Sequence, residues 1–165
     1  MKRLVVTLSL IALPFAASAS PELAGDWGAK AADLHEETSG LITEIDTKGA
    51  ATLPSDYETD IARFATTASR LGTWIDGNKG PSDLGCIFRG MAQEGEVQID
   101  ALDHADTLAD RRASLVRLAT MFADAETVSL AAIASARGGA PTPTVTSGVA
   151  MSCEADAGLA LKALD

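Results

Sequence analysis

The sequence predicts an all-α protein: an up-down bundle of four longer helices, with a fifth, shorter C-terminal helix docked by a disulfide. Apolar residues recur at alternating spacings of three and four, which place them in one stripe on a helix of 3.6 residues per turn. No stretch of the sequence shows the period-two alternation of a strand. Aromatic residues make up only 4% of the chain and alanine is abundant, which suits helices that approach closely.

The N-terminal segment is typical of a secretory signal peptide. Lys2-Arg3 precedes an apolar stretch over residues 4–15, and Ala17-Ser18-Ala19 has the small-x-small pattern that a signal peptidase recognises. A membrane anchor is disfavoured because this stretch is well short of the ~20 residues that cross a bilayer. We therefore expect a signal peptide over residues 1–19, cleavage near Ala19, a single helical domain over residues 20–165, and a periplasmic or secreted protein.

The charge balance limits the partners. Loss of Lys2 and Arg3 with the signal peptide would change the formal charge from −10 to −12. Such a field repels nucleic acid and anionic membrane surfaces, so we expect no nucleic-acid partner, and the mature chain has no predicted membrane span. An acidic, solvated surface explains the charge most simply, and a cationic partner or metal ions are the alternative.

Two helices are predicted in the N-terminal half. The first extends from Glu22 to about Asp46, and the second from Tyr57 to about Asp76. Ser55 and Glu58 have the spacing of a capping box at the start of the second helix. The two apolar stripes consist of Leu23, Trp27, Leu34, Leu41 and Ile45, and of Tyr57, Ile61, Phe64, Ala68, Leu71 and Ile75.

The third and fourth helices must be separated by a break. Residues 82–137 contain no proline, yet as one helix they would extend roughly 80 Å, far beyond what the partner helices could cover. We place the break at residues 103–107, where Thr107 and Asp110 form a second pair with capping-box spacing. A kink at Gly95 is the alternative.

The C-terminal part is predicted to form a stiff linker over residues 140–144 and a fifth helix from Ser147 to Leu164. In an exported protein, Cys86 and Cys153 are expected to pair. An up-down bundle brings the end of the fourth helix back to the end where Cys86 lies, so the two cysteines can meet. Without a C-x-x-C motif, the bond is expected to be structural, contributing roughly 4 kcal/mol.

A cluster of aromatic and methionine residues is predicted in the lower half of the bundle, the half where Cys86 lies. It could form a pocket for Cu(I) or a flat cofactor, whereas ordinary core packing is the competing interpretation. The residues are Trp27, Trp74, Phe88, Met91, Met121, Phe122 and Met151.

The two histidines are candidate metal ligands. His35 lies among acidic neighbours, and His104 follows Asp100 by one helical turn. Their different heights along the bundle argue against one shared ion, and the competing interpretation is a solvated face with an Asp100–His104 pair. The sequence lacks Gly-x-Ser-x-Gly, His-Glu-x-x-His and a phosphate loop, so no enzyme activity is predicted.

The architecture resembles the exported four-helix cytochromes of the c-prime and b-562 types, including the stretches Phe88-Arg89-Gly90 and Gln98-Ile99-Asp100. This resemblance implies a haem between the helices. The sequence departs from it, because C-x-x-C-H is absent and the last bundle helix has no histidine. Haem would require an unusual pair such as His35 with Met121.

The sequence therefore predicts an exported helical bundle that acts as a non-catalytic binding or interaction module. Its partner would be a protein or a small molecule, and the sequence also permits a homodimer. The alternative is a periplasmic haem- or metal-binding bundle, with haem or copper as cofactor.

Overall fold

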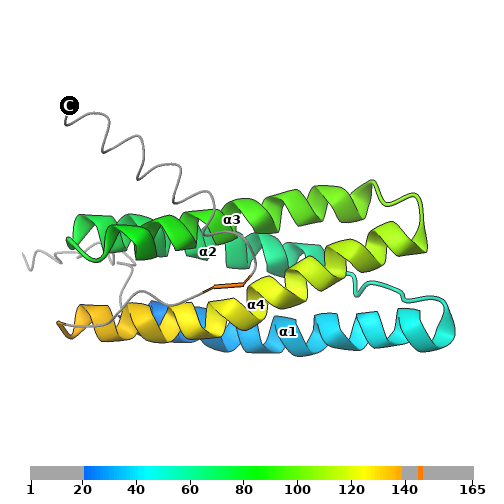
Figure 1. Cartoon of the computed structure of the whole chain (residues 1–165), viewed down its shortest axis with the longest axis horizontal. Helices are drawn as coiled ribbons and strands as arrows, with labels where there is room; N and C mark the ends of the chain where they lie inside the picture. Colours follow the sequence, from blue (N-terminus) through cyan, green and yellow to red (C-terminus); the bar gives the residue numbers. More distant parts are fainter. Residues whose placement is uncertain (1–20, 139–144, 147–165) are drawn as a thin grey trace, which may run out of the picture.

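The computed structural model describes residues 21–138 and 145–146, which form an elongated bundle of antiparallel helices (Figure 1). No strand occurs in these two ranges, as the sequence predicts. The helices are α1 (Pro21–Lys48), α2 (Tyr57–Gly77), α3 (Ser82–Asp103) and α4 (Leu108–Ala136).

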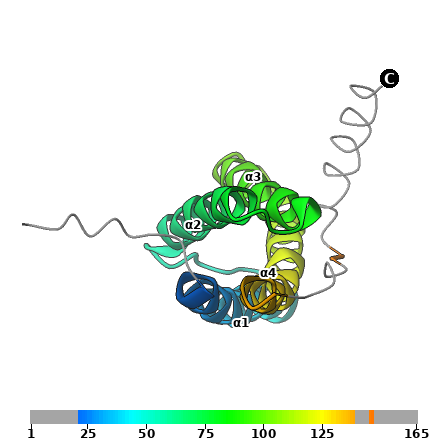
Figure 2. The same ribbon diagram turned by 90° about the vertical axis from the view of Figure 1, so that its left-hand side faces the viewer.

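The four helices form two tightly packed pairs. α1 packs mainly against α4, and α2 mainly against α3, with α3 and α4 also in contact (Figure 2). α1 and α2 contact each other less than any of these three pairs does, although they are consecutive. The α2–α3 turn (residues 78–81) lies at the same end of the bundle as the start of α1 and the end of α4. We call this end the Trp74 end.

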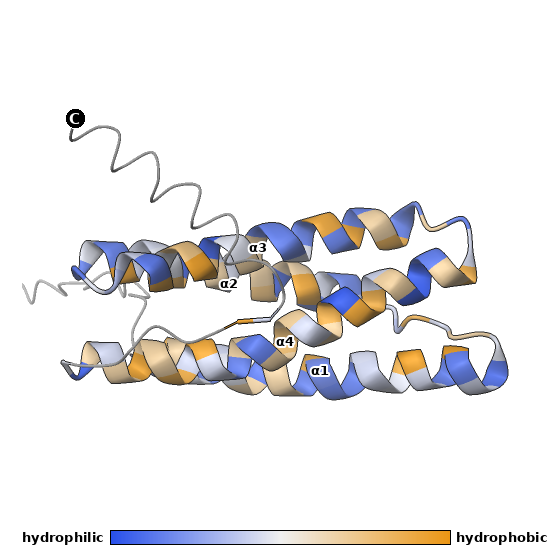
Figure 3. Ribbon diagram, in the orientation of Figure 1, coloured by the Kyte–Doolittle hydropathy of each residue, from blue (hydrophilic) through white to orange (hydrophobic). Residues whose placement is uncertain are grey.

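The core consists of apolar stripes that face inward from all four helices. In Figure 3, hydrophobic and hydrophilic segments alternate along each helix, as expected when one face is buried.

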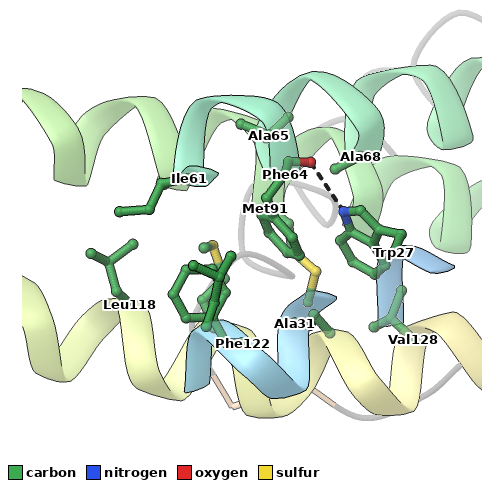
Figure 4. Packing of buried hydrophobic residues seen from close by; sticks show 14 of the residues in the cluster. Trp27, Ala31, Ile61, Phe64, Ala65, Ala68, Met91, Leu118, Phe122 and Val128 are labelled. Carbon is green, nitrogen blue, oxygen red and sulfur yellow. Dashed lines mark hydrogen bonds between the residues drawn. The ribbon is translucent and has the colours of Figure 1, made fainter. Parts of the chain in front are cut away.

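Phe64 is at the centre of an aromatic cluster in this core. Its ring stacks on Trp27 at 4.5 Å and meets Phe122 edge-on at 5.1 Å, both measured between ring centroids. The indole of Trp27 also packs against Phe88 at 5.0 Å and donates a 3.0 Å hydrogen bond from Nε1 to the Phe64 carbonyl (Figure 4). Each aromatic pair is worth roughly 0.5–1.5 kcal/mol beyond the area it buries.

Small residues allow the two helices of each pair to approach closely. A Cβ added to Gly28 on α1 would lie 2.2 Å from the hydroxyl oxygen and 2.6 Å from Cβ of Ser129 on α4. A Cβ added to Gly72 on α2 would lie 2.9 Å from the backbone oxygen of Gly85 on α3. Glycine is therefore required at positions 28 and 72 by the distance between the helices.

The predicted break between the third and fourth helices is confirmed. α3 ends at Asp103, and Thr107 is the N-cap of α4: its hydroxyl oxygen accepts a 3.1 Å hydrogen bond from the Asp110 N–H and lies 2.6 Å from the Asp110 carboxylate. The alternative at Gly95 is wrong, because α3 is continuous there.

The predicted capping box at Ser55 and Glu58 is also wrong. Asp56 occupies the N-cap position and makes no side-chain capping hydrogen bond. Instead the Tyr57 N–H donates to the Pro54 carbonyl at 3.2 Å, so a backbone turn satisfies the first donor of α2.

The chain returns to the bundle after α4. Asp124, a buried carboxylate on α4, accepts hydrogen bonds from the Thr146 N–H at 2.6 Å and from the Thr146 hydroxyl at 3.0 Å. The linker over residues 140–144, the predicted fifth helix and Cys153 lie outside the described residues. The disulfide that would dock this helix therefore stays a prediction, with Cys86 buried near the start of α3.

The first prediction concerns the contact between α1 and α4. We expect Gly28→Ala to lower the free energy of unfolding by about 1–3 kcal/mol, because the new Cβ overlaps Ser129. Gly40→Ala is the matched control: no atom lies within 4 Å of a Cβ at that exposed position of α1, so alanine should stabilise the helix by roughly 0.5–1 kcal/mol. Urea unfolding of the two variants measures both effects. Equal stabilities would contradict this packing, and Ser129→Gly should restore part of the Gly28→Ala loss.

The second prediction concerns Tyr57, the one tyrosine of the chain. Burial raises its pKa to about 12, although a 2.6 Å hydrogen bond to Thr38 acts in the opposite direction. An unfolded tyrosine ionises near pH ~10, so the unfolded state loses its proton first and stability falls between about pH 10 and pH 12. Absorbance titration of the phenol measures the pKa. Tyr57→Phe should reduce the alkaline loss of stability by roughly 1.4 kcal/mol per pH unit, and an unperturbed pKa would contradict the buried environment.

Candidate functional site

The seven residues of the predicted aromatic and methionine pocket are not all brought together. Trp74 is partly buried at the Trp74 end, and Met151 lies outside the described residues. The other five are at most 2% exposed and are packed within the core: Trp27, Phe88, Met91, Met121 and Phe122. Side chains thus occupy the middle of the described bundle.

A depression of about 540 Å³ lies beside Trp74, between the α2–α3 turn and the last turns of α4. We call it the Trp74 depression. Its wall combines one indole with apolar side chains, an amide, a lysine and a hydroxyl. The lining residues are Trp74, Ile75, Asn78, Lys79, Gly80, Pro81, Ser135, Ala136 and Gly138.

The α2–α3 turn that borders the Trp74 depression is fixed by hydrogen bonds to the end of α2. Asn78 donates from its backbone N–H at 3.0 Å and from its side-chain amide at 2.8 Å to the Trp74 carbonyl. The Gly80 N–H donates to the Ile75 carbonyl at 2.8 Å, and Lys79 between them has a φ of 56°. A Cβ at Gly80 would lie 2.8 Å from Ile75 Cγ2, so the turn requires glycine there. The wall is therefore a defined backbone structure.

A second, shallower depression of about 360 Å³ lies between α1 and α2, above Trp27 and Phe64. Three of its charged side chains are paired with one another: Asp60 lies 2.6 Å from the Lys30 ammonium and 3.2 Å from the Arg63 guanidinium. The hydrogen bond from Lys30 is the main cause that lowers the pKa of Asp60. A ligand here would have to compete with these pairs.

The two histidines lie on separate parts of the bundle. His35 Nδ1 on α1 is 3.8 Å from a Glu126 carboxylate oxygen on α4, and its side chain is 40% exposed. His104, just after α3, lies 2.8 Å through Nδ1 from the Asp100 carbonyl and 3.4 Å from the Asp100 carboxylate. The hydrogen bond with this carbonyl, and then the nearby carboxylate charge, raise the pKa of His104. Within the residues described, His, Cys, Asp and Glu form no group of three or more that could hold a metal ion.

α4 is long and apolar enough to cross a membrane, by length and composition alone. Among the described helices it is the one that meets this test, and 44% of its most apolar window is buried in the bundle. The core helix of a bundle meets the same test, so this observation is weak evidence for a membrane span.

No model of a protein family, no curated protein and no solved structure matches the chain.

Sequence reasoning identified Trp74 as a candidate but missed the other residues of the depression. The turn signal at residues 77–81 was visible, as was the double glycine that ends the fourth helix. The sequence does not show that the α2–α3 turn and the end of α4 lie side by side. Their proximity depends on the length of α4 relative to α2 and on how the α1–α4 pair packs against the α2–α3 pair.

Proposed function

We propose that this chain is an exported, non-catalytic binding protein whose small-molecule ligand, or a short segment of a partner protein, binds in the Trp74 depression. One observation carries the proposal: the depression has a volume of about 540 Å³ and a mixed apolar and polar wall. Ligand sites commonly have volumes of roughly 300–1,000 Å³ and combine apolar walls with a few polar groups.

The partial exposure of the Trp74 side chain supports a ligand site in this depression. The side chain is only partly buried, unlike Trp27, which is 2% exposed. A tryptophan with one accessible side contributes a large apolar area while its N–H can meet water or a ligand. Trp74 is thus the aromatic group best placed to contact a ligand among the described residues.

The packed interior supports a binding protein over a haem or metal protein. A haem between the helices would need the space that Phe64, Met91, Met121 and Phe122 fill, each at most 2% exposed. The described residues therefore do not fit a haem, and a copper site would have to use exposed side chains such as His35 or His104. We derive no function through either group.

Export and the disulfide are part of the same proposal. Cys86 is buried one turn into α3, at the Trp74 end. Thr146 is held on α4 by Asp124, and the seven residues from 147 to 153 can span up to about 23–25 Å if extended. A bond between Cys86 and Cys153 would fasten the C-terminal segment to α3.

The third prediction tests the binding site. We expect ligands from a mixed small-molecule fragment library to shift backbone amide signals of residues 74–81 and 135–138 in ¹⁵N-labelled mature protein, and to leave the core amides unchanged. Trp74→Ala should weaken such binding at least tenfold, through loss of roughly 1.4 kcal/mol of contact. Leu130→Ala is the matched control, because Leu130 is 67% exposed on α4 and does not line the depression. Shifts confined to core amides, or no shifts with any compound, would refute the proposed site.

The fourth prediction tests export and the disulfide. Protein purified after secretion should have a mass that begins after Ala19 and increases by about 2 Da on reduction, as expected for one disulfide. Cys153→Ser should abolish this mass change and lower the stability by roughly 2–4 kcal/mol. An uncleaved chain would refute export, and two free thiols in the secreted protein would refute the bond.

A further inference from the structure

We infer that the Trp74 depression binds a small organic anion, namely a carboxylate attached to an apolar or aromatic body. This inference rests on the proposed binding function and adds the ligand class. It is drawn from the charge of the wall, from the hydrogen-bond donors that the wall leaves unused and from the orientation of a neighbouring acidic side chain.

The wall of the depression has a positive charge. Among the described residues that line it, Lys79 is the one with a charged side chain, and none has a carboxylate. The Lys79 ammonium makes no ion pair within the part of the chain that the structure describes. The same holds for the guanidinium of Arg137, which directly follows the lining residue Ala136. Both basic residues are exposed, so a ligand can reach them.

Unpaired basic side chains are unexpected in this chain, because acidic residues outnumber basic ones by 23 to 13. Arg111, at the opposite end of the bundle, also lacks an ion pair within the residues described. Other basic side chains of the described bundle are paired with carboxylates, namely Lys30, Lys48, Arg63, Arg89, Arg112 and Arg117. An anionic ligand could therefore approach Lys79 without first breaking an ion pair of the described chain.

Asp76, the acidic residue nearest to Lys79 in the sequence, is directed toward α3. It lies in the last turn of α2, and its Oδ1 is 2.3 Å from the position that a Cβ on Gly85 would take. Its other carboxylate oxygen accepts a hydrogen bond from the Arg89 guanidinium, also on α3. The charge of Asp76 is thus offset by Arg89, which reduces its repulsion of an anion beside Lys79.

The C-termini of α2 and α4 border the depression, and their partial negative charge would oppose an anion. Their last carbonyls are already capped by backbone N–H groups. The carbonyls of Trp74 and Ile75 accept hydrogen bonds from the α2–α3 turn, and those of Ala134 and Ser135 accept from residues 137 and 138. The capping groups offset part of the helix-end charge, whereas no carboxylate among the described residues pairs with Lys79.

Three polar side chains of the wall are free to donate hydrogen bonds in the described structure: the Lys79 ammonium, the Trp74 indole N–H and the Ser135 hydroxyl. The Asn78 amide, by contrast, already donates to the Trp74 carbonyl. An ionised carboxylate has only acceptors, so it complements these three donors. The indole and the apolar side chain of Ile75 supply contact area for an apolar or aromatic body.

The experiment compares 2-naphthoate with 2-naphthamide, its neutral analogue of nearly the same shape, on the full mature protein at low salt. Backbone amide shifts of residues 74–81 and 135–138 measure the two affinities. We expect 2-naphthoate to bind roughly three- to fivefold more tightly, which is what one exposed ion pair can contribute. The difference should shrink at about 0.5 M salt, because salt screens exposed charges.

Variants assign this preference to Lys79. Lys79→Gln should remove most of it and Lys79→Arg should retain it, because only the first substitution removes the charge. Lys48→Gln is the matched control: it removes an exposed lysine charge at the end of α1, at the opposite end of the bundle, and should leave both affinities unchanged. Trp74→Leu should weaken both probes alike and leave their ratio unchanged, since the indole contacts the body that they share.

The outcomes separate the ligand class from the binding function. Equal binding of the two probes, tighter binding of the amide, or an unchanged preference in Lys79→Gln would overturn the anion inference while the binding function stands. The ligand class is also wrong if neither probe binds but other fragments shift residues 74–81. If no compound of any class shifts these residues, the proposed function itself fails. The Lys79 variants alter an exposed turn residue, so the test does not depend on how well the Trp74 variant folds.

Discussion

The hydrogen bond from the Trp27 indole to the Phe64 carbonyl joins the two halves of this bundle. α1 and α2 contact each other less than the other neighbouring helices do, and this 3.0 Å buried bond connects them directly. The stacking of Trp27 on Phe64 and the packing of Phe64 against Phe122 extend the link to α4. An unpaired buried indole N–H would cost roughly 1–3 kcal/mol, so the donor and acceptor fix the register of α1 on α2.

The close approach within each helix pair determines where space remains. Gly28 and Ser129 bring α1 onto α4, and Gly72 and Gly85 bring α2 onto α3, so large side chains fill the region between the two pairs. Since this middle region is occupied, the volume available to a ligand lies at the surface, and the larger of the two depressions considered is at the Trp74 end. The filled interior and the surface position of these depressions are thus consequences of the same arrangement.

The helices and the break before Thr107 were predictable because apolar periodicity and capping patterns are local properties of the chain. The N-terminus of α2 was not, since a Pro54–Tyr57 backbone turn competes with the capping pair and satisfies the same donor. Periodicity also shows which residues of a helix are buried, but it does not show against which helix. Trp27 and Trp74 therefore looked alike in the sequence, although Trp27 is packed at the centre and Trp74 borders the depression.

Acrylamide quenching of tryptophan fluorescence tests most directly whether the interior is closed while the Trp74 end is open. The chain has two tryptophans, so Trp74→Phe reports on Trp27 alone, and the difference from the unaltered protein reports on Trp74. We expect the Trp27 emission to be nearly insensitive to acrylamide and the Trp74 emission to be quenched readily, because only a solvent-accessible indole can meet the quencher. Efficient quenching of Trp27 would show an open interior and contradict both the closed core and the proposed location of the binding site.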